Sequence, residues 1–160
     1  MRLLLVTLLL AVVFVVATGG SLPPVVASHF IAGGVANGFM PRATYLRFMT
    51  ALLVGLPLLI ALLSSVMAIL PINRINLPNR EYWLAPERRR DTLAYLRKHG
   101  IHFGFILTLF LCFVHWLVVR ANAFSPPRFP ESLFFIGVAA FLLALAVWLG
   151  GFIAHFRLRP

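Results

Sequence analysis

Four long apolar runs constrain the fold of this chain more than any other feature. They cover residues 3–18, 48–70, 101–119 and 133–155. A helix needs about 20 apolar residues to cross a hydrocarbon core about 30 Å thick, and only the first run falls clearly short. With 61% hydrophobic and 11% charged residues, the chain has too little polar surface for a soluble globule. We expect an all-α, polytopic membrane protein: one integral membrane domain, residues 1–160, folded as a four-helix transmembrane bundle.

The first apolar run has a second interpretation, as a signal peptide. Val15-Val16-Ala17 and Val25-Val26-Ala27 both offer small residues at which a signal peptidase cuts. Against cleavage, the charged region before the run is only Met1-Arg2, and the run is long for a signal sequence. We expect the first span to be retained, and cleavage would not change the orientation of the other three.

Basic residues are distributed unevenly between the connections. With the N-terminus inside, ten of the 14 Lys and Arg residues fall on the inner side and four on the outer side. The inner set is Arg2, Arg74, Arg80, Arg88, Arg89, Arg90, Arg97, Lys98, Arg157 and Arg159, and the outer set is Arg42, Arg47, Arg120 and Arg128. The bias predicts that both termini are cytoplasmic. Basic residues beside anionic lipid gain about 1 kcal/mol each, so the net charge needs no nucleic-acid partner.

The two outer loops differ in composition. The first, residues 19–46, places two β-favouring stretches around Gly33-Gly34, which predicts a small hairpin or a compact, structured loop. The second, Asn122 to Ser132, is short and carries three prolines that hold it extended. We interpret it as a strap between spans.

The first outer loop also carries a resemblance to a known family. Leu22-Pro23-Pro24-Val25-Val26-Ala27-Ser28-His29-Phe30, followed by Gly34 and Asn37-Gly38, resembles the bacterial membrane domain of unknown function 1648. The resemblance covers residues 5–60, about a third of the chain. The same domain stands at the N-terminus of SdpI-type immunity proteins, but this chain has Asn37 where the family usually has an acid, and no SdpI-type second half. The resemblance therefore implies a multi-pass protein of the bacterial cytoplasmic (inner) membrane, without implying immunity function.

The inner loop, residues 71–100, holds most of the charge. Seven of the 14 basic residues and three of the four acids lie between Arg74 and Lys98. From Pro86 we expect a short cytoplasmic helix that lies along the membrane and bends at Gly100 into the third span. The loop is expected to contact anionic lipid and, as a sharper hypothesis, to dock a partner. The candidate interaction residues are Arg80, Glu81, Tyr82, Trp83, Glu87, Arg88 and Arg89, with His29 and Asn37 in the outer loop.

Histidine is the residue type with most chemical potential here, because an ionisable group inside a membrane is costly to bury. His102 and His155, from two different spans, form a pair that could hold a haem or a metal, although boundary positions explain both more simply. His29 is interpreted as a loop anchor, with a ligand role as the alternative. No catalytic residue and no cofactor are predicted, since the chain has no paired cysteines and no His-Glu-x-x-His motif.

Two classes of function fit this pattern. The first is a non-enzymatic membrane protein of the unknown-function 1648 type, with the outer loop and the basic inner loop as interaction surfaces. The second is an accessory subunit of a larger redox or transport complex in the membrane, and a homo-oligomer is also possible. A stripe of Gly137, Ala140 and Ala144 in the fourth span would let another helix approach closely, from the same chain or from another subunit.

Overall fold

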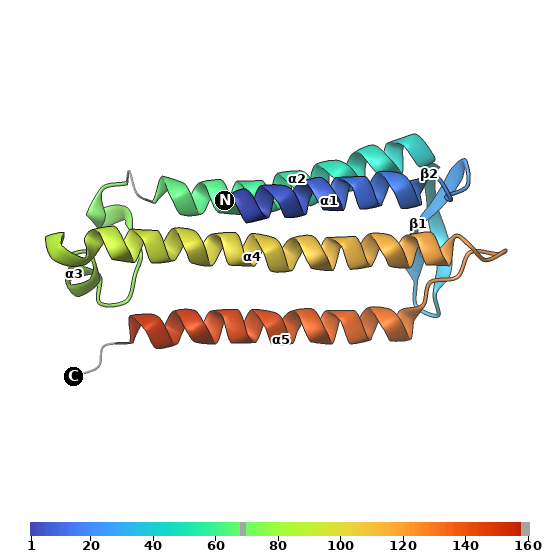
Figure 1. The fold of residues 1–160 in the computed structure, drawn as a ribbon. Helices are drawn as coiled ribbons and strands as arrows, with labels where there is room; N and C mark the ends of the chain where they lie inside the picture. Colours follow the sequence, from blue (N-terminus) through green and yellow to red (C-terminus); the bar gives the residue numbers. More distant parts are fainter. Residues whose placement is uncertain (68–69, 158–160) are drawn as a thin grey trace.

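The computed structural model describes residues 1–67 and 70–157 of the chain. Within them lie four long helices, α1 (Arg2–Gly19), α2 (Arg42–Val66), α4 (Pro86–Ala121) and α5 (Glu131–Phe156), each long and apolar enough to cross a membrane (Figure 1). The shorter elements are strands β1 (Val25–Ile31) and β2 (Val35–Pro41), a 3-10 turn at Ile72–Arg74 and helix α3 (Arg80–Trp83). The four predicted spans are therefore confirmed as helices; the second helix ends at Val66, and residues 68–69 of the predicted span lie outside the described residues.

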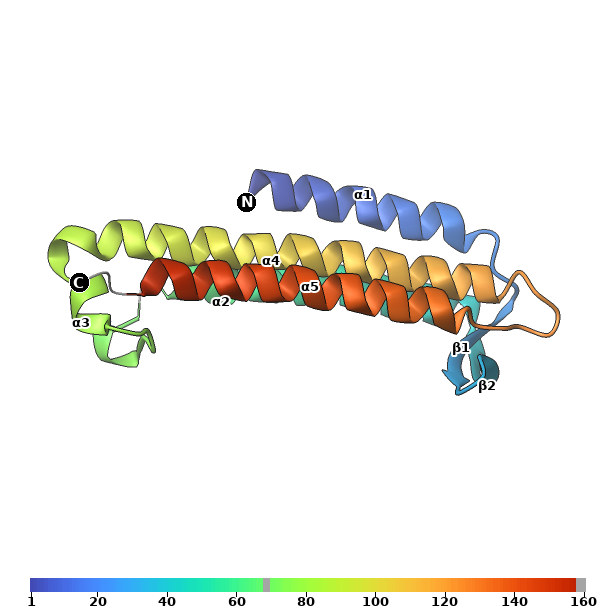
Figure 2. The same ribbon diagram turned by 90° about the horizontal axis from the view of Figure 1, so that it is seen from below.

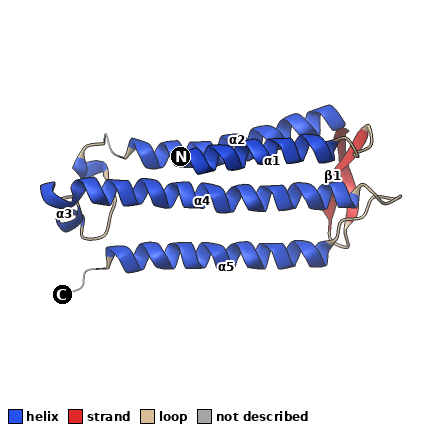
Figure 3. Cartoon of the chain, in the orientation of Figure 1, coloured by secondary structure: helices blue, strands red, loops and turns tan. Residues whose placement is uncertain are grey.

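A two-stranded antiparallel sheet makes the all-α prediction incomplete (Figure 3). The predicted hairpin forms because Gly33 and Gly34 adopt φ values of +85° and +71°, a region that residues with a Cβ rarely enter. The strands pair from Val25 opposite Pro41 to Ile31 opposite Val35. The register shifts on either side of His29, which pairs with Gly38, and the pairs before and after it share the same register.

Helices α1, α2 and α4 pack against one another and form the core. Helix α5 packs on α4 (Figures 1 and 2). The buried positions of α1 and α2 recur every three or four residues, so each helix presents one stripe to the core. These residues are Leu4, Leu8, Ala11 and Val15 in α1, and Tyr45, Met49, Leu53, Pro57 and Ala61 in α2. In α5 only Phe156 is buried.

The bend predicted at Gly100 is wrong, because α4 continues without interruption from Pro86 to Ala121. The expected interfacial helix is the first part of this long helix. Gly100 faces Ser64 of α2 so closely that a Cβ would overlap its hydroxyl, and a Cβ on Gly104 would lie 3.3 Å from the Pro57 carbonyl oxygen. Both glycines therefore allow close helix packing, the use that small residues four apart have in membrane bundles.

The stripe of small residues in α5 faces its own chain. Gly137 receives the ring of Phe113 from α4, and a Cβ there would overlap that ring. Ala140 and Ala144 line hollows between α4 and α5. Gly137 of the stripe thus packs on α4, whereas Ala140 is exposed, and contact of the stripe with another subunit stays a prediction.

The bundle has two dissimilar ends. The hairpin end comprises the β1–β2 hairpin and the connection from Asn122 to Pro130, and the basic end comprises residues 71–98 with the end of α5. Helix α1 ends at the hairpin end of the bundle, and its N-terminus stops short of the basic end in both views (Figures 1 and 2). Leu4 of α1 packs over Gly104, with side-chain carbons 3.6 Å from the position of a Cβ there, which places the start of α1 near Gly100 along α4.

Candidate functional site

The loop at the basic end is folded onto α4 and α5. Ile75, Leu77 and Leu84 are buried with Leu96 of α4 and Phe156 of α5 in a second apolar cluster. The Thr92 hydroxyl donates to the Trp83 carbonyl at 2.8 Å. Trp83 in turn donates its indole N–H to the Phe156 carbonyl at 3.2 Å, one of the carbonyls left free at the end of α5. The loop is therefore an ordered part of the fold.

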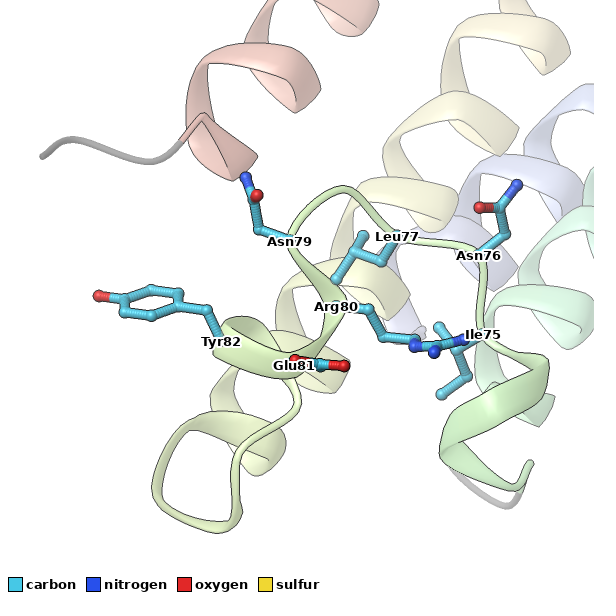
Figure 4. Close-up of a pocket in the computed structure, with 7 residues that line it drawn as sticks. All are labelled: Ile75, Asn76, Leu77, Asn79, Arg80, Glu81 and Tyr82. Carbon is cyan, nitrogen blue, oxygen red and sulfur yellow. The ribbon is translucent and has the colours of Figure 1, made fainter.

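A pocket of about 470 Å³ opens on this loop (Figure 4). Its lining is Ile75, Asn76, Leu77, Asn79, Arg80, Glu81 and Tyr82. Asn79 has φ +51°, which turns the chain just before α3 begins. Arg80 extends toward Ile75 and donates to the Asn73 carbonyl at 3.2 Å, whereas Tyr82 points away from both (Figure 4). The pocket thus combines an apolar floor with one basic, one acidic and two amide side chains.

The seven candidate interaction residues of the inner loop differ in where they lie relative to this pocket. Arg80, Glu81 and Tyr82 all line the pocket. Arg88 lies over the Tyr82 ring, 4.0 Å from its centroid, and donates to the Tyr82 carbonyl at 3.1 Å. Glu87 and Arg89 lie in the first turn of α4 and do not line this pocket.

Trp83, another of the candidate interaction residues, packs against the end of α5. Its ring stacks on His155, with centroids 5.5 Å apart, and meets Phe156 edge-on. Trp83 therefore packs the loop against the end of α5. Local sequence pattern could not predict these contacts, because the partners lie about 70 residues away in the sequence.

Five rings form a continuous stack at the basic end: Trp83, His155, Tyr95, His99 and Trp148. The centroid separations along the stack are 5.5, 3.6, 5.4 and 4.3 Å, and neighbouring rings lie within 26° of parallel. Tyr95 donates its hydroxyl to the Gly151 carbonyl, and Trp148 donates its N–H to the His99 carbonyl. The stack is what joins this end of α5 to α4.

His99 was missed by sequence reasoning, which placed it at the end of a short helix. Its Nε2 atom is buried without a hydrogen-bond partner among the described residues. The spacing of Tyr95 and His99, four residues apart on one helix face, together with Trp148, Phe152 and His155 at four and three on α5, was the available signal.

The proposed haem or metal pair gains no support from the arrangement. His155 is stacked on Tyr95, whereas His102 lies seven residues further along α4, about 10 Å of helix rise. Within the described residues, no group of three or more His, Cys, Asp or Glu side chains is placed to hold a metal ion. The pair stays a hypothesis.

At the hairpin end, His115 is fully buried between three helices. Thr18 of α1 donates its hydroxyl to the Phe14 carbonyl at 2.7 Å, so its oxygen accepts from His115 Nε2 at 2.9 Å. His115 Nδ1 then accepts from the Tyr45 hydroxyl of α2, also at 2.9 Å. The result is a one-directional chain of hydrogen bonds with a neutral imidazole at its centre, in which every donor has an acceptor.

The hairpin is fastened to the connection between α4 and α5. Asn122 bonds both the N–H and the carbonyl of Ala27, at 2.8 and 2.9 Å. The Phe129 N–H donates to the Gly34 carbonyl at 2.9 Å, and the Gly33 N–H donates to a Glu131 carboxylate oxygen at 2.9 Å. His29 and Asn37, the two outer-loop candidates, are exposed and hydrogen-bonded to each other across the hairpin. His29, interpreted from the sequence as a loop anchor, therefore bonds to a side chain of the opposite strand.

Comparisons of the chain with protein-family models, with curated proteins and with solved structures found no match. The resemblance to the domain of unknown function 1648 stays a prediction that rests on the residues of the hairpin segment.

Proposed function

We propose that this chain is an integral membrane protein that acts by binding, with the pocketed loop at the basic end as its docking surface for a protein partner. The observation that carries the proposal is the contrast between four apolar helices and one ordered, charged loop whose pocket is lined by Arg80, Glu81 and Tyr82. A mixed lining of this kind fits a peptide segment that carries polar groups of both signs and one apolar side chain.

Helix lengths support the membrane location. Helix α1 has 18 residues, about 27 Å at 1.5 Å per residue, and this matches a hydrocarbon core about 30 Å thick. Helix α4 has 36 residues, about 54 Å, and therefore extends well beyond such a core. The extension lies at the basic end and carries Arg88, Arg89, Arg90, Arg97 and Lys98. By the positive-inside rule, we place this end in the cytoplasm.

The buried polar groups favour binding over catalysis within the bundle. His115, Thr18 and Tyr45 use their polar atoms on one another. Ser64, Ser65 and Thr108 each bond back to the carbonyl four residues earlier. All six groups therefore have hydrogen-bond partners within the bundle, whereas the charged side chains of the loop line an open pocket.

Membrane location and orientation are tested first. The chain should stay in the membrane fraction after carbonate extraction. In a Cys112→Ala background, Asn37→Cys should label only from outside and Glu87→Cys only from inside. Release by carbonate would contradict the location, and the reverse labelling would contradict the orientation.

Docking is tested by a photo-crosslinking amino acid at Tyr82, 44% exposed, against the same group at Phe39 on the hairpin, 56% exposed. We expect a discrete protein adduct from position 82 alone, reduced several-fold by Arg80→Ala with Glu81→Ala. Identical adducts at both positions, or none at 82 in intact cells, would refute docking at the loop.

A second candidate function, membership of a larger membrane complex, is favoured by α5. Phe135, Leu142 and Leu149 repeat every seven residues and are 65%, 54% and 47% exposed. A neighbouring subunit or lipid would cover this face. In a mild detergent, a stable assembly that separates when these three residues become alanine favours the complex, and a single chain of unchanged size favours lipid.

A further inference from the structure

Helices α4 and α5 leave a long groove between them. Two adjoining hollows, of about 790 and 480 Å³, share Ile106, Ala140 and Ala144 in their linings. The groove exists because small residues of α5 face larger ones of α4. At Gly137 the space is filled from the opposite side, by Phe113. Toward the hairpin end the groove is lined almost entirely by apolar side chains.

The mouth of the groove, toward the basic end, is different. Lys98, His99 and His102 line it together with Tyr95 and Trp148. None of the chain's four acids, Glu81, Glu87, Asp91 and Glu131, lines either hollow. Lys98 and His102 are exposed, and His99 has a buried ring nitrogen without a partner among the described residues. The groove therefore has nitrogen donors at one end and hydrocarbon along its length.

The mouth also lies at the level where a membrane changes from hydrocarbon to headgroups. Leu4 packs over Gly104, so Arg2, the first charged residue of α1, stands near the Lys98–His102 segment of α4. Tyr95, Trp83 and Trp148 gather at the same end, and such aromatic rings favour the interface. On this placement, Ile106 and the residues after it in α4 lie at the depth of the hydrocarbon core.

We propose that this groove binds one anionic glycerophospholipid, with its phosphate at Lys98 and His102 and one acyl chain along Ile106, Ala140 and Ala144. A lipid with a net negative headgroup fits better than a zwitterionic one, because the mouth holds a positive charge and no acid to receive a choline or ethanolamine group. The inference rests on the membrane location proposed above, and it is independent of the docking loop.

The test uses the full chain reconstituted in vesicles of equal phosphatidylglycerol and phosphatidylcholine, extracted in a mild detergent and analysed by mass spectrometry for retained lipid. Wild type should retain about one phosphatidylglycerol per chain. The double variant Lys98→Gln with His102→Gln should lower the ratio of retained phosphatidylglycerol to phosphatidylcholine about fivefold. This factor corresponds to the attraction of one basic residue to an anionic headgroup. Arg90→Gln, which removes an exposed charge outside the groove, should leave the ratio unchanged.

The tail site has its own pair of variants. Ala144→Leu fills the groove and should reduce retention of both lipids, whereas Ala146→Leu, exposed on another face of α5, should not. Equal retention of both lipids by wild type, no effect of the Lys98 and His102 changes, or a crosslink from position 144 to a second copy of the chain would each overturn the inference. Release from the membrane by carbonate would instead refute the proposed membrane location, so the two failures are distinguishable.

Discussion

The two ends of the bundle use their polar groups in opposite ways. At the hairpin end, His115 and Asn122 bond across elements that are far apart in the sequence. At the basic end, a histidine nitrogen is buried without a partner among the described residues, and charged side chains line a pocket and the mouth of a groove. A buried polar group that is fully bonded stabilises one arrangement. A group with unused bonding capacity is free to take part in binding, so the difference supports the proposal that the basic end serves recognition and the hairpin end holds the fold together.

The largest effect should come from His115→Leu. The variant leaves the buried Tyr45 hydroxyl without its acceptor and removes the link between α1, α2 and α4. We expect a loss of about 2–3 kcal/mol in the free energy of unfolding, the cost of an unsatisfied buried polar group plus lost packing. In thermal unfolding in detergent, this corresponds to a fall in Tm of about 5–10 °C.

His155→Leu at the basic end is the matched control, because this histidine is exposed and held by stacking. It should cost less than about 1 kcal/mol. Adding Tyr45→Phe to His115→Leu should recover part of the loss, since the unbonded hydroxyl is then absent. Equal losses for the two histidine variants would remove the basis of the comparison.

Asn122→Ala should have the next largest effect. Its side chain bonds the Ala27 N–H, the Ala27 carbonyl and the Val118 carbonyl, and thereby holds the hairpin to the end of α4. We expect a loss of about 1–2 kcal/mol, and faster amide hydrogen exchange at Ala27. Asn76→Ala, an exposed amide in the pocket of the basic end, should change neither measurement by more than its error.

The sequence predicted those features that depend on local pattern. Run length indicated four helices, and a Gly-Gly pair between β-favouring stretches indicated the hairpin. Contacts between distant residues could not be predicted in the same way. Gly100 was interpreted as a bend because a glycine within a helix indicates either a breaker or a close approach, and only the position of Ser64 decides between them. The sequence indicated that a histidine inside a span is costly to bury, but it could not identify the partners of His115, which lie 70 and 97 residues away. The candidate interaction residues Arg80, Glu81 and Tyr82 were chosen from local composition, and the structure places all three around one pocket, while docking itself stays a proposal.

The smallest effect on stability should come from Tyr82→Ala, compared with Trp83→Ala beside it. Tyr82 is exposed, and its main contact is the Arg88 cation over its ring, worth about 0.5–1 kcal/mol at such a site. Trp83 packs against His155 and Phe156 and donates to the end of α5, so its removal should cost about 3 kcal/mol. Thermal unfolding gives the stability of each variant, and a crosslinking amino acid at Asn76, which also lines the pocket, reports partner capture. Tyr82→Ala should unfold within about 3 °C of wild type yet lose partner capture, because a docking residue contributes little until its partner is bound. A large fall in Tm for Tyr82→Ala would mean that this ring holds the loop together. The side chains of the basic end would then have a structural role like those of the hairpin end, which would contradict the comparison.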